Sequence, residues 1–250
     1  MEDATIARLL DINRQFYQTF ALQFSQTRQR LQPGVLHILE TYFSKARQPF
    51  TVLDLGCGNG ELARRLADLN PQGAYVGVDL SPGLLQEAQQ NYAATMQASF
   101  IQLDLANPGW DRALVNQGLV TQPPFDRILA FALLHHIPGR ALRMEILRSV
   151  RQLATREGLF IHSEWQFLNS PRLRQRIQPW EAAGMSPAEV EAGDYLLDWK
   201  HGGYGLRYVH QFSLQELESM ANKAGFEIID NFMSDGEGGN LGLYQVWKAV

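Results

Sequence analysis

The sequence is poor in cysteine, in long apolar runs and in excess charge, and each shortage excludes a class of protein. Cys57 is its one cysteine, so neither an intrachain disulfide nor a cysteine-based metal cluster can form, and we expect no resident metal ion. No apolar run approaches the roughly 20 residues that a helix needs to span a bilayer. The first sixteen residues lack the apolar core of a signal peptide. We therefore expect a cytoplasmic protein without membrane contact.

The charge balance is nearly even. The chain has 22 basic and 26 acidic residues, a formal net charge of −4. This balance does not favour a nucleic-acid binder, although a local basic face is compatible with it. Arginine-rich stretches at residues 140–156 and 172–176 are either solvated helix faces or phosphate-binding surfaces, with Trp165 and Trp180 available for base stacking.

Segments with strand and helix patterns alternate from residue 50 onward. Apolar runs predict strands at 50–56, 74–80, 99–105, 125–134, 158–165, 227–234 and 241–250. Helical patterns predict helices at 59–70, 81–96, 140–154 and 213–226, two of which have a serine N-cap, Ser81 and Ser213. This alternation predicts an α/β, Rossmann-like fold with a mostly parallel sheet and helices on both faces.

Two regions fall outside this alternation. Residues 4–30 have an aromatic-rich helical face, which either docks on the core or forms a lid over a pocket. A break at Pro33-Gly34 precedes a second helix at 35–43. Residues 166–210 hold several prolines and glycines without a clear period, so we expect an irregular insertion at the carboxyl edge of the sheet. The predicted units are therefore a helical lid (1–48), a core (49–165 and 211–250) and a substrate-side insertion (166–210).

The glycine-rich segment "VLDLGCGNGEL" (52–62) joins the first predicted strand to its helix. Gly56, Gly58 and Gly60 allow a ligand to approach backbone amides and the positive end of a helix. Asp54 would repel a pyrophosphate there, whereas it can hold a cationic amine. This spacing favours a ligand with an amino acid end and argues against a nicotinamide-dependent oxidoreductase.

Two further acids stand at strand ends in step with Asp54. Asp79 ends the second predicted strand, where a carboxylate can accept hydrogen bonds from both hydroxyls of a ribose. Asp104 ends the third, within reach of an adenine amine. Three acids on one edge of the sheet make a far more specific pattern than a glycine motif alone.

These residues resemble the motifs of class I S-adenosylmethionine-dependent methyltransferases, "LDLGCGNG" the first motif and "GVDLS" the second. The resemblance implies a seven-stranded sheet whose last strand is antiparallel, with S-adenosylmethionine as cofactor. Cys57 is interpreted as a small side chain in a tight loop. The residues that the resemblance assigns to cofactor binding are Arg28, Asp54, Gly56, Cys57, Gly58, Gly60, Asp79, Leu80, Asp104, Leu105, Ala130, Phe131 and His135.

Three further segments resemble the methyltransferases that esterify 5-carboxymethyluridine at the wobble position of tRNA. They are Phe24-Ser25-Gln26-Thr27-Arg28, His135-His136 and Arg207-Tyr208-Val209-His210, while Asp198 stands where that family has a proline. Arg28 is predicted to fold over the methionine end of the cofactor. One histidine of the pair either covers the adenosine or lines the acceptor pocket, or the pair merely caps a helical turn.

The predicted acceptor-side residues are Arg207, His210 and His136. A carboxylate acceptor needs no general base, only a cation that holds it, and Arg207 is the candidate unless it pairs with Asp194 or Asp198. His136 and His210 are the candidate bases for any other acceptor. The methyl acceptor is therefore tRNA, a small carboxylate or a hydroxylated metabolite. A cofactor-binding regulatory partner without activity is the alternative outside enzymes, and the sequence allows an activating protein partner without indicating one.

Overall fold

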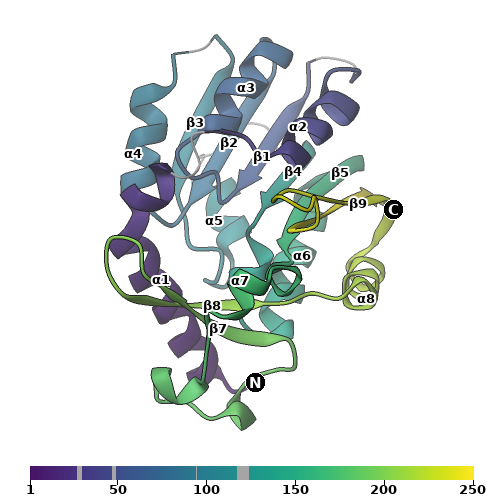
Figure 1. Ribbon diagram of the computed structural model, residues 1–250. Coiled ribbons are helices and arrows are strands. Elements are labelled where there is room, and N and C mark those ends of the chain that lie inside the picture. Colours follow the sequence, from purple (N-terminus) through teal and green to yellow (C-terminus); the bar gives the residue numbers. More distant parts are fainter. Residues whose placement is uncertain (27–29, 47–48, 94, 117–123) are drawn as a thin grey trace.

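A seven-stranded sheet in the order β3-β2-β1-β4-β5-β10-β9 organises the chain. The computed structural model describes residues 1–26, 30–46, 49–93, 95–116 and 124–250. The strands of this sheet are β1 (Thr51–Leu55), β2 (Ala74–Asp79), β3 (Gln97–Gln102), β4 (Phe125–Phe131), β5 (Ala154–Trp165), β9 (Phe226–Ser234) and β10 (Gly242–Ala249). The neighbours from β3 to β5 are parallel, and β10 is antiparallel to β5 and β9. The predicted topology, including the antiparallel last strand, is confirmed (Figure 1).

Helices cover both faces of this sheet and enclose a separate apolar core on each. One face packs against α2 (Pro33–Ile38), α3 (Glu61–Leu69) and α4 (Pro82–Asn91). The other packs against α5 (Trp110–Asn116), α6 (Arg140–Leu153) and α8 (Leu214–Ala224). Ser81 and Ser213 cap α4 and α8 by accepting from Leu84 N and Glu216 N, as the sequence predicts. Pro33 begins α2, which continues without a break into a π-helical turn, η1 (Leu39–Phe43).

The insertion is more regular than the sequence suggests. Instead of an irregular segment, residues 166–210 contain a second sheet of three antiparallel strands, β6 (Ile177–Gln178), β7 (Asp194–Trp199) and β8 (Gly205–His210). Two short helical turns, η3 (Phe167–Asn169) and α7 (Pro171–Arg174), precede this sheet, and two more, η4 (Trp180–Ala183) and η5 (Pro187–Glu189), lie between β6 and β7. Prolines or glycines begin or end α7, η4 and η5, which explains why no period is visible in the sequence.

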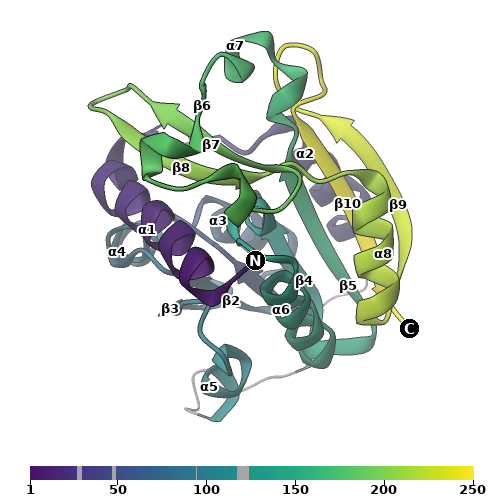
Figure 2. The ribbon, with the colours of Figure 1, turned by 90° about the horizontal axis from the view of Figure 1, so that it is seen from below.

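The N-terminal helix α1 (Asp3–Gln26) lies alongside β7 and β8 of the insertion (Figure 2). Phe16 and Phe20 of its aromatic face are buried, and both rings contact the Trp199 ring of β7. The helix therefore docks on the insertion rather than on the main sheet, and this leaves another of its faces free to line a cavity. None of the helices in the described ranges is long and apolar enough to cross a membrane.

Candidate functional site

The glycine-rich turn after β1 requires a backbone that other residues rarely adopt. Gly58 and Gly60 have φ values of +56° and +75°, in the left-handed region. A Cβ at Gly60 would lie 2.9 Å from the Ala88 Cβ of α4, so the close packing of this turn on α4 also requires glycine. A Cβ at Gly58 would meet no atom within 4 Å. The turn therefore faces open space, where a ligand can reach its backbone.

Asp54 is buried at the end of β1, beside this turn. Its carboxylate accepts a hydrogen bond from the Tyr75 hydroxyl, at 2.5 Å. Burial, reinforced by the charge of Asp79, raises the pKa of Asp54 from 3.8 to about 7, although the Tyr75 hydrogen bond lowers it. A cationic amine placed next to this carboxyl group would favour its ionised form.

Cofactor affinity should therefore depend on the ionisation of Asp54. Between pH 5.5 and 7, binding of an ammonium group must first ionise a carboxyl whose pKa is about 7. The sequence resemblance implies that this ligand is S-adenosylmethionine, so we expect the affinity for S-adenosylhomocysteine to rise by up to about tenfold per pH unit over this range. Isothermal titration calorimetry of the wild type and of Asp54→Asn, in which the amide oxygen can still accept from Tyr75, checks this.

In Asp54→Asn the affinity should not change with pH below pH 7. The control variant Asp68→Asn, at an exposed site, should show the same pH dependence of affinity as the wild type. The ligand-free fold binds an extra proton at Asp54 between about pH 4 and 7, because the folded-state pKa lies above the ordinary 3.8. Its stability therefore falls as the pH rises through this window. An unchanged pH dependence of binding in Asp54→Asn would place the ammonium group elsewhere.

Asp79 ends β2 and faces the same space as the turn. Its two carboxylate oxygens accept from Gly58 N, at 2.9 Å, and from Ser81 N, at 2.8 Å. Burial raises its pKa, although these backbone hydrogen bonds lower it. Asp79 thus fixes the glycine turn and keeps further lone pairs directed into the cavity, as a ribose-binding carboxylate requires.

Asp104 follows β3 and pairs with a residue of α1. Arg14 Nη2 lies 2.6 Å from Asp104 Oδ2, and Ala106 N donates to Asp104 Oδ1 at 2.9 Å. Both side chains of the pair line the cavity. The ion pair thus connects the N-terminal helix to the edge of the sheet where the three acids lie.

A cavity of about 300 Å³ joins these parts, a volume at the lower end of those of small-molecule sites. Its walls are the glycine turn, the ends of β2 and β3, residues 131–137 and the polar face of α1. The predicted site residues that line it are Asp54, Gly56, Cys57, Gly58, Asp79, Leu80, Asp104, Leu105, Phe131 and His136. Gly60, Ala130, His135, Arg207 and His210 lie outside this lining, and Arg28 lies outside the described residues.

The cavity also has walls that the sequence did not single out. Asn13, Arg14, Tyr17 and Gln18 come from α1, and Arg30 comes from the segment before α2. Positions 13, 14, 17 and 18 share one helical face by their spacing, but aromatic residues dominate the sequence pattern of α1. Arg30, two residues after the predicted cofactor-binding residue Arg28, is a cation that lines the cavity.

The two adjacent histidines have different surroundings. His136 lines the cavity, where its Nε2 lies 2.8 Å from the Tyr17 hydroxyl and its Nδ1 lies 3.3 Å from the Tyr208 carbonyl oxygen. His135 is buried, and its Nδ1 lies 3.0 Å from Glu164 Oε2. Burial raises the pKa of Glu164 well above its ordinary value. His136 therefore lies where an acceptor in the cavity can contact it, whereas His135 is buried behind the cavity wall.

Arg207 and His210 lie on β8, behind α1. The Arg207 guanidinium is buried against aromatic rings, 4.5 Å from the centroid of Trp165 and 5.3 Å from that of Phe16. The two acids considered as its partners are bound by other groups: Asp194 by Tyr208 and His210, and Asp198 by Lys200 and Arg176. The acceptor role of Arg207 stays a prediction, and in this conformation an aromatic ring would have to move to expose it.

Cys57 is buried beside the glycine turn. A Cβ at Gly77 of β2 would lie 2.8 Å from its Sγ, so the turn packs tightly on that strand. Burial raises the pKa of the Cys57 thiol, which keeps it protonated. This environment agrees with a packing side chain. Within the described ranges, no group of three or more His, Cys, Asp or Glu side chains is arranged to hold a metal ion.

Comparisons with known proteins agree with this geometry. Residues 53–160, which span the glycine turn, the three strand-end acids and His135-His136, match the model of a family described as a methyltransferase domain. The fold is that of S-adenosylmethionine-dependent methyltransferases. One similar structure is Burkholderia thailandensis 1,6-didemethyltoxoflavin-N1-methyltransferase with bound S-adenosylhomocysteine (TM-score 0.63, 17% identity, 99% of this chain and 88% of that one). Residues 53–160 are therefore a methyltransferase domain.

A second solved structure and three curated relatives extend the comparison of this methyltransferase. A chain from the complex between a Haloferax volcanii methyltransferase activator and a methyltransferase superposes with a TM-score of 0.65, at 15% identity, over 96% of this chain and 97% of that one. A protein of Encephalitozoon cuniculi named as a methyltransferase is 26% identical over 86% of this chain and 87% of its own length.

Two relatives carry specific names. The tRNA (carboxymethyluridine(34)-5-O)-methyltransferase of Saccharomyces cerevisiae is 31% identical over 54% of this chain and 40% of its own length. The malonyl-[acyl-carrier protein] O-methyltransferase of Pseudescherichia vulneris is 28% identical over 66% of this chain and 68% of its own length. These relatives are all named as methyltransferases, but two of their names specify different methyl acceptors.

The cavity of the methyltransferase fits S-adenosylmethionine, its cofactor. The open space at Gly58 admits a ligand against the backbone of the turn. Asp54 suits the ammonium group, Asp79 the ribose and Asp104 the adenine amine, and all three acids line one continuous cavity. Arg30 can face the carboxylate of the methionine end, as Arg28 was predicted to do.

Proposed function

We propose that this methyltransferase forms a methyl ester on a carboxylate of its acceptor. The observation that carries the proposal is the lining of the cavity on the side of α1. The described lining residues of α1 and of 131–137 include no acid, and their polar members are Asn13, Arg14, Tyr17, Gln18 and His136. On this side an anionic acceptor meets no acid and lies near Arg14, whose partner is Asp104, whereas the three acids favour the cationic and hydroxylated parts of the cofactor.

The chain itself has little chemistry to perform on such an acceptor. When bound, S-adenosylmethionine supplies an electrophilic methyl group on a positively charged sulfur. A carboxylate is already ionised at neutral pH, so no side chain has to remove a proton. The tasks left to the protein are to hold the acceptor in line and to exclude water. Tyr17 and His136, hydrogen-bonded to each other, line the cavity where they can position the acceptor, and α1 covers the cavity.

The first candidate acceptor is a carboxymethylated wobble uridine of tRNA. Three segments of this chain resemble the methyltransferases of that nucleoside, and the Saccharomyces cerevisiae relative is named for it. The insertion adds basic groups: Arg172, Arg176 and Lys200 line a hollow on its surface together with one acid, Asp198, and Arg174 is exposed next to it. Cations in such an arrangement can neutralise phosphates.

A small carboxylate, or a carrier-bound one, is the second candidate. The Pseudescherichia vulneris relative is named for a malonyl group, which carries a free carboxylate. The net charge of −4 favours this acceptor over a polyanion. In this case the basic hollow of the insertion would not take part in the reaction.

Transfer of labelled methyl groups distinguishes these candidates. The protein should be incubated with labelled S-adenosylmethionine and, separately, with total tRNA and with a small-metabolite extract, each with and without a methyltransferase activator protein. We expect label in tRNA that mild alkali releases as methanol, and no label with Asp79→Ala. Label only in the metabolite fraction would exclude tRNA. A product stable to alkali would contradict ester formation and make His136 the candidate general base.

A further inference from the structure

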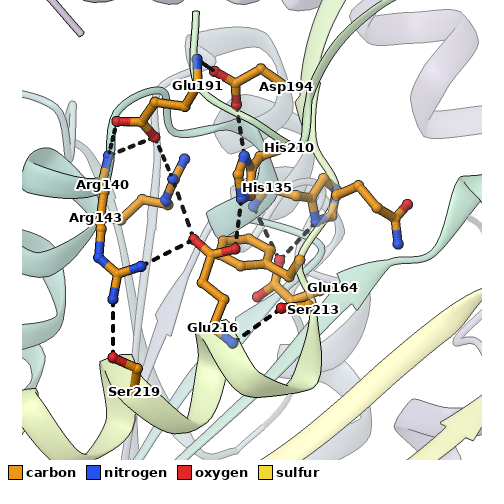
Figure 3. A network of polar contacts seen from close by, with 12 residues as sticks. His135, Arg140, Arg143, Glu164, Glu191, Asp194, His210, Ser213, Glu216 and Ser219 are labelled. Atoms are coloured by element: carbon orange, nitrogen blue, oxygen red, sulfur yellow. Dashed lines mark hydrogen bonds and ion pairs between the residues drawn. The ribbon is translucent and has the colours of Figure 1, made fainter.

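A partly buried network of charged residues joins the insertion to the main domain at a distance from the glycine turn (Figure 3). Arg140 and Arg143 of α6 face Glu216 of α8 and Glu191, which precedes β7. Arg143 is fully buried, and its Nη2 lies 2.9 Å from Glu191 Oε2. The network is thus a contact between three parts of the chain, and charge complementarity holds it together.

His210 of β8 lies in the middle of this network. Its Nδ1 lies 2.6 Å from Asp194 Oδ1 and its Nε2 lies 3.0 Å from Glu216 Oε2, while only 1% of the residue is exposed. Both ring nitrogens face carboxylates, and only a protonated imidazole can donate to both. Burial by itself would lower the pKa of His210, but the hydrogen bonds to Asp194 and Glu216 outweigh it and raise the pKa above 6.5.

A chain of hydrogen bonds leads from His210 to the cavity wall. Asp194 Oδ1 also accepts from the Tyr208 hydroxyl, at 2.7 Å. The Asn13 side chain binds the backbone N and O of Tyr208 and donates to the His136 carbonyl oxygen at 3.0 Å. From the other side of the network, Arg143 Nη1 donates to the Ile137 carbonyl oxygen at 3.0 Å.

We propose that protonated His210 is a positioning residue: it docks the insertion on α6 and α8 and thereby fixes the turn at 134–137, whose residues His136 and Ile137 line the cavity. The inference concerns the acceptor-side wall and holds for any acceptor, so it does not depend on the proposed ester chemistry.

Loss of the proton weakens the docking for two reasons. A neutral imidazole has one N–H, so either Asp194 or Glu216 loses its donor. Three acids, Glu191, Asp194 and Glu216, then face only two arginines, whereas with the proton the charges balance. Burial raises the pKa of Glu164, which lies beside this network, well above its ordinary value. The docking is therefore fully present below about pH 6.5 and is lost as the pH rises through the folded-state pKa of His210.

Hydrogen–deuterium exchange across pH 6 to 9 tests the proposal on the full chain. After correction for intrinsic exchange rates, protection of amides in 194–210 and in 134–137 should fall together, by up to about tenfold per pH unit above the pKa of His210. Amides of β1 and β2 should stay protected throughout. Protection that does not change with pH in 194–210, or that changes there but not in 134–137, would overturn the proposal.

Two variants keep the test decisive. His210→Gln cannot titrate, so its protection in both segments should be low and independent of pH, whereas the exposed control His37→Gln should keep the transition of the wild type. If His210→Gln fails to fold, Glu216→Gln replaces it. Removal of that carboxylate should shift the transition to lower pH without abolishing it. A transition that persists in His210→Gln, or that does not move in Glu216→Gln, would overturn the proposal.

Discussion

Replacement of Asp79 by alanine should weaken S-adenosylhomocysteine binding by two orders of magnitude or more. The carboxylate lines the cavity and also accepts from Gly58 N and Ser81 N, so its loss removes a ribose partner and loosens the turn. Each charge-assisted hydrogen bond contributes about 1.5–3 kcal/mol, and two such bonds correspond to at least a hundredfold in affinity. Isothermal titration calorimetry measures the change directly.

The control for this experiment is Asp68→Ala, which removes an exposed carboxylate of α3 that pairs only weakly with Arg65, at 3.5 Å. This variant should bind as the wild type does. Asp79→Asn should fall between the two, because the amide oxygen can still accept one hydrogen bond. Full affinity in Asp79→Ala would show that the ribose lies elsewhere in the cavity.

Replacement of Arg143 by methionine should lower the free energy of unfolding by about 3 kcal/mol. Methionine fills much of the same space, but the change leaves Glu191 and Glu216 short of a cation and the Ile137 carbonyl without this donor. Loss of one partner of a buried ion pair is strongly destabilising because the remaining charge stays desolvated. Unfolding in urea, followed by far-UV circular dichroism, measures the effect.

Arg148→Met provides the matched control on the same helix. Arg148 is exposed, so its replacement should change the free energy of unfolding by no more than about 0.5 kcal/mol. If Arg143→Met cost less than about 1 kcal/mol, Arg140 would have to compensate for the lost charge, and the double variant would then unfold at far lower urea concentration.

The sequence predicts the main sheet well because its central strands β1, β2 and β4 are nearly continuous apolar runs, each followed by a turn or a helix. The three acids were recognisable for the same reason: parallel strands bring their carboxyl ends to one edge, so Asp54, Asp79 and Asp104 had to lie close together. For these strands and acids, the local sequence pattern and the three-dimensional fold agree.

The insertion is not predictable in this way. Its strands contain buried acids, Asp194 and Asp198, which local patterns assign to the surface. Most of their partners lie on other elements: His210 of β8 is sixteen residues from Asp194 in the sequence, and Arg176 next to β6 pairs with Asp198, whereas Lys200 directly follows β7. For the same reason Arg207 and His210 could be recognised as unusual residues while their neighbours could not.

The contribution of α1 to the cavity also could not be predicted from the sequence. Its aromatic side predicts burial, and this is correct for Phe16 and Phe20. Its polar side looks like an ordinary solvated face, although Asn13, Arg14 and Tyr17 line the cavity. Nothing in local periodicity distinguishes a polar face turned to water from one turned to a ligand.

The Asn13 side chain has a consequence for the order of events during synthesis. It holds Tyr208, 195 residues further along the chain, and the carbonyl of His136. The N-terminal helix leaves the ribosome first, but its place on the molecule exists only once β8 has been made. A nascent chain that ends before residue 210 thus has the glycine turn and all three acids without the wall that covers them. Retention of the cofactor should begin only after β8 has been translated.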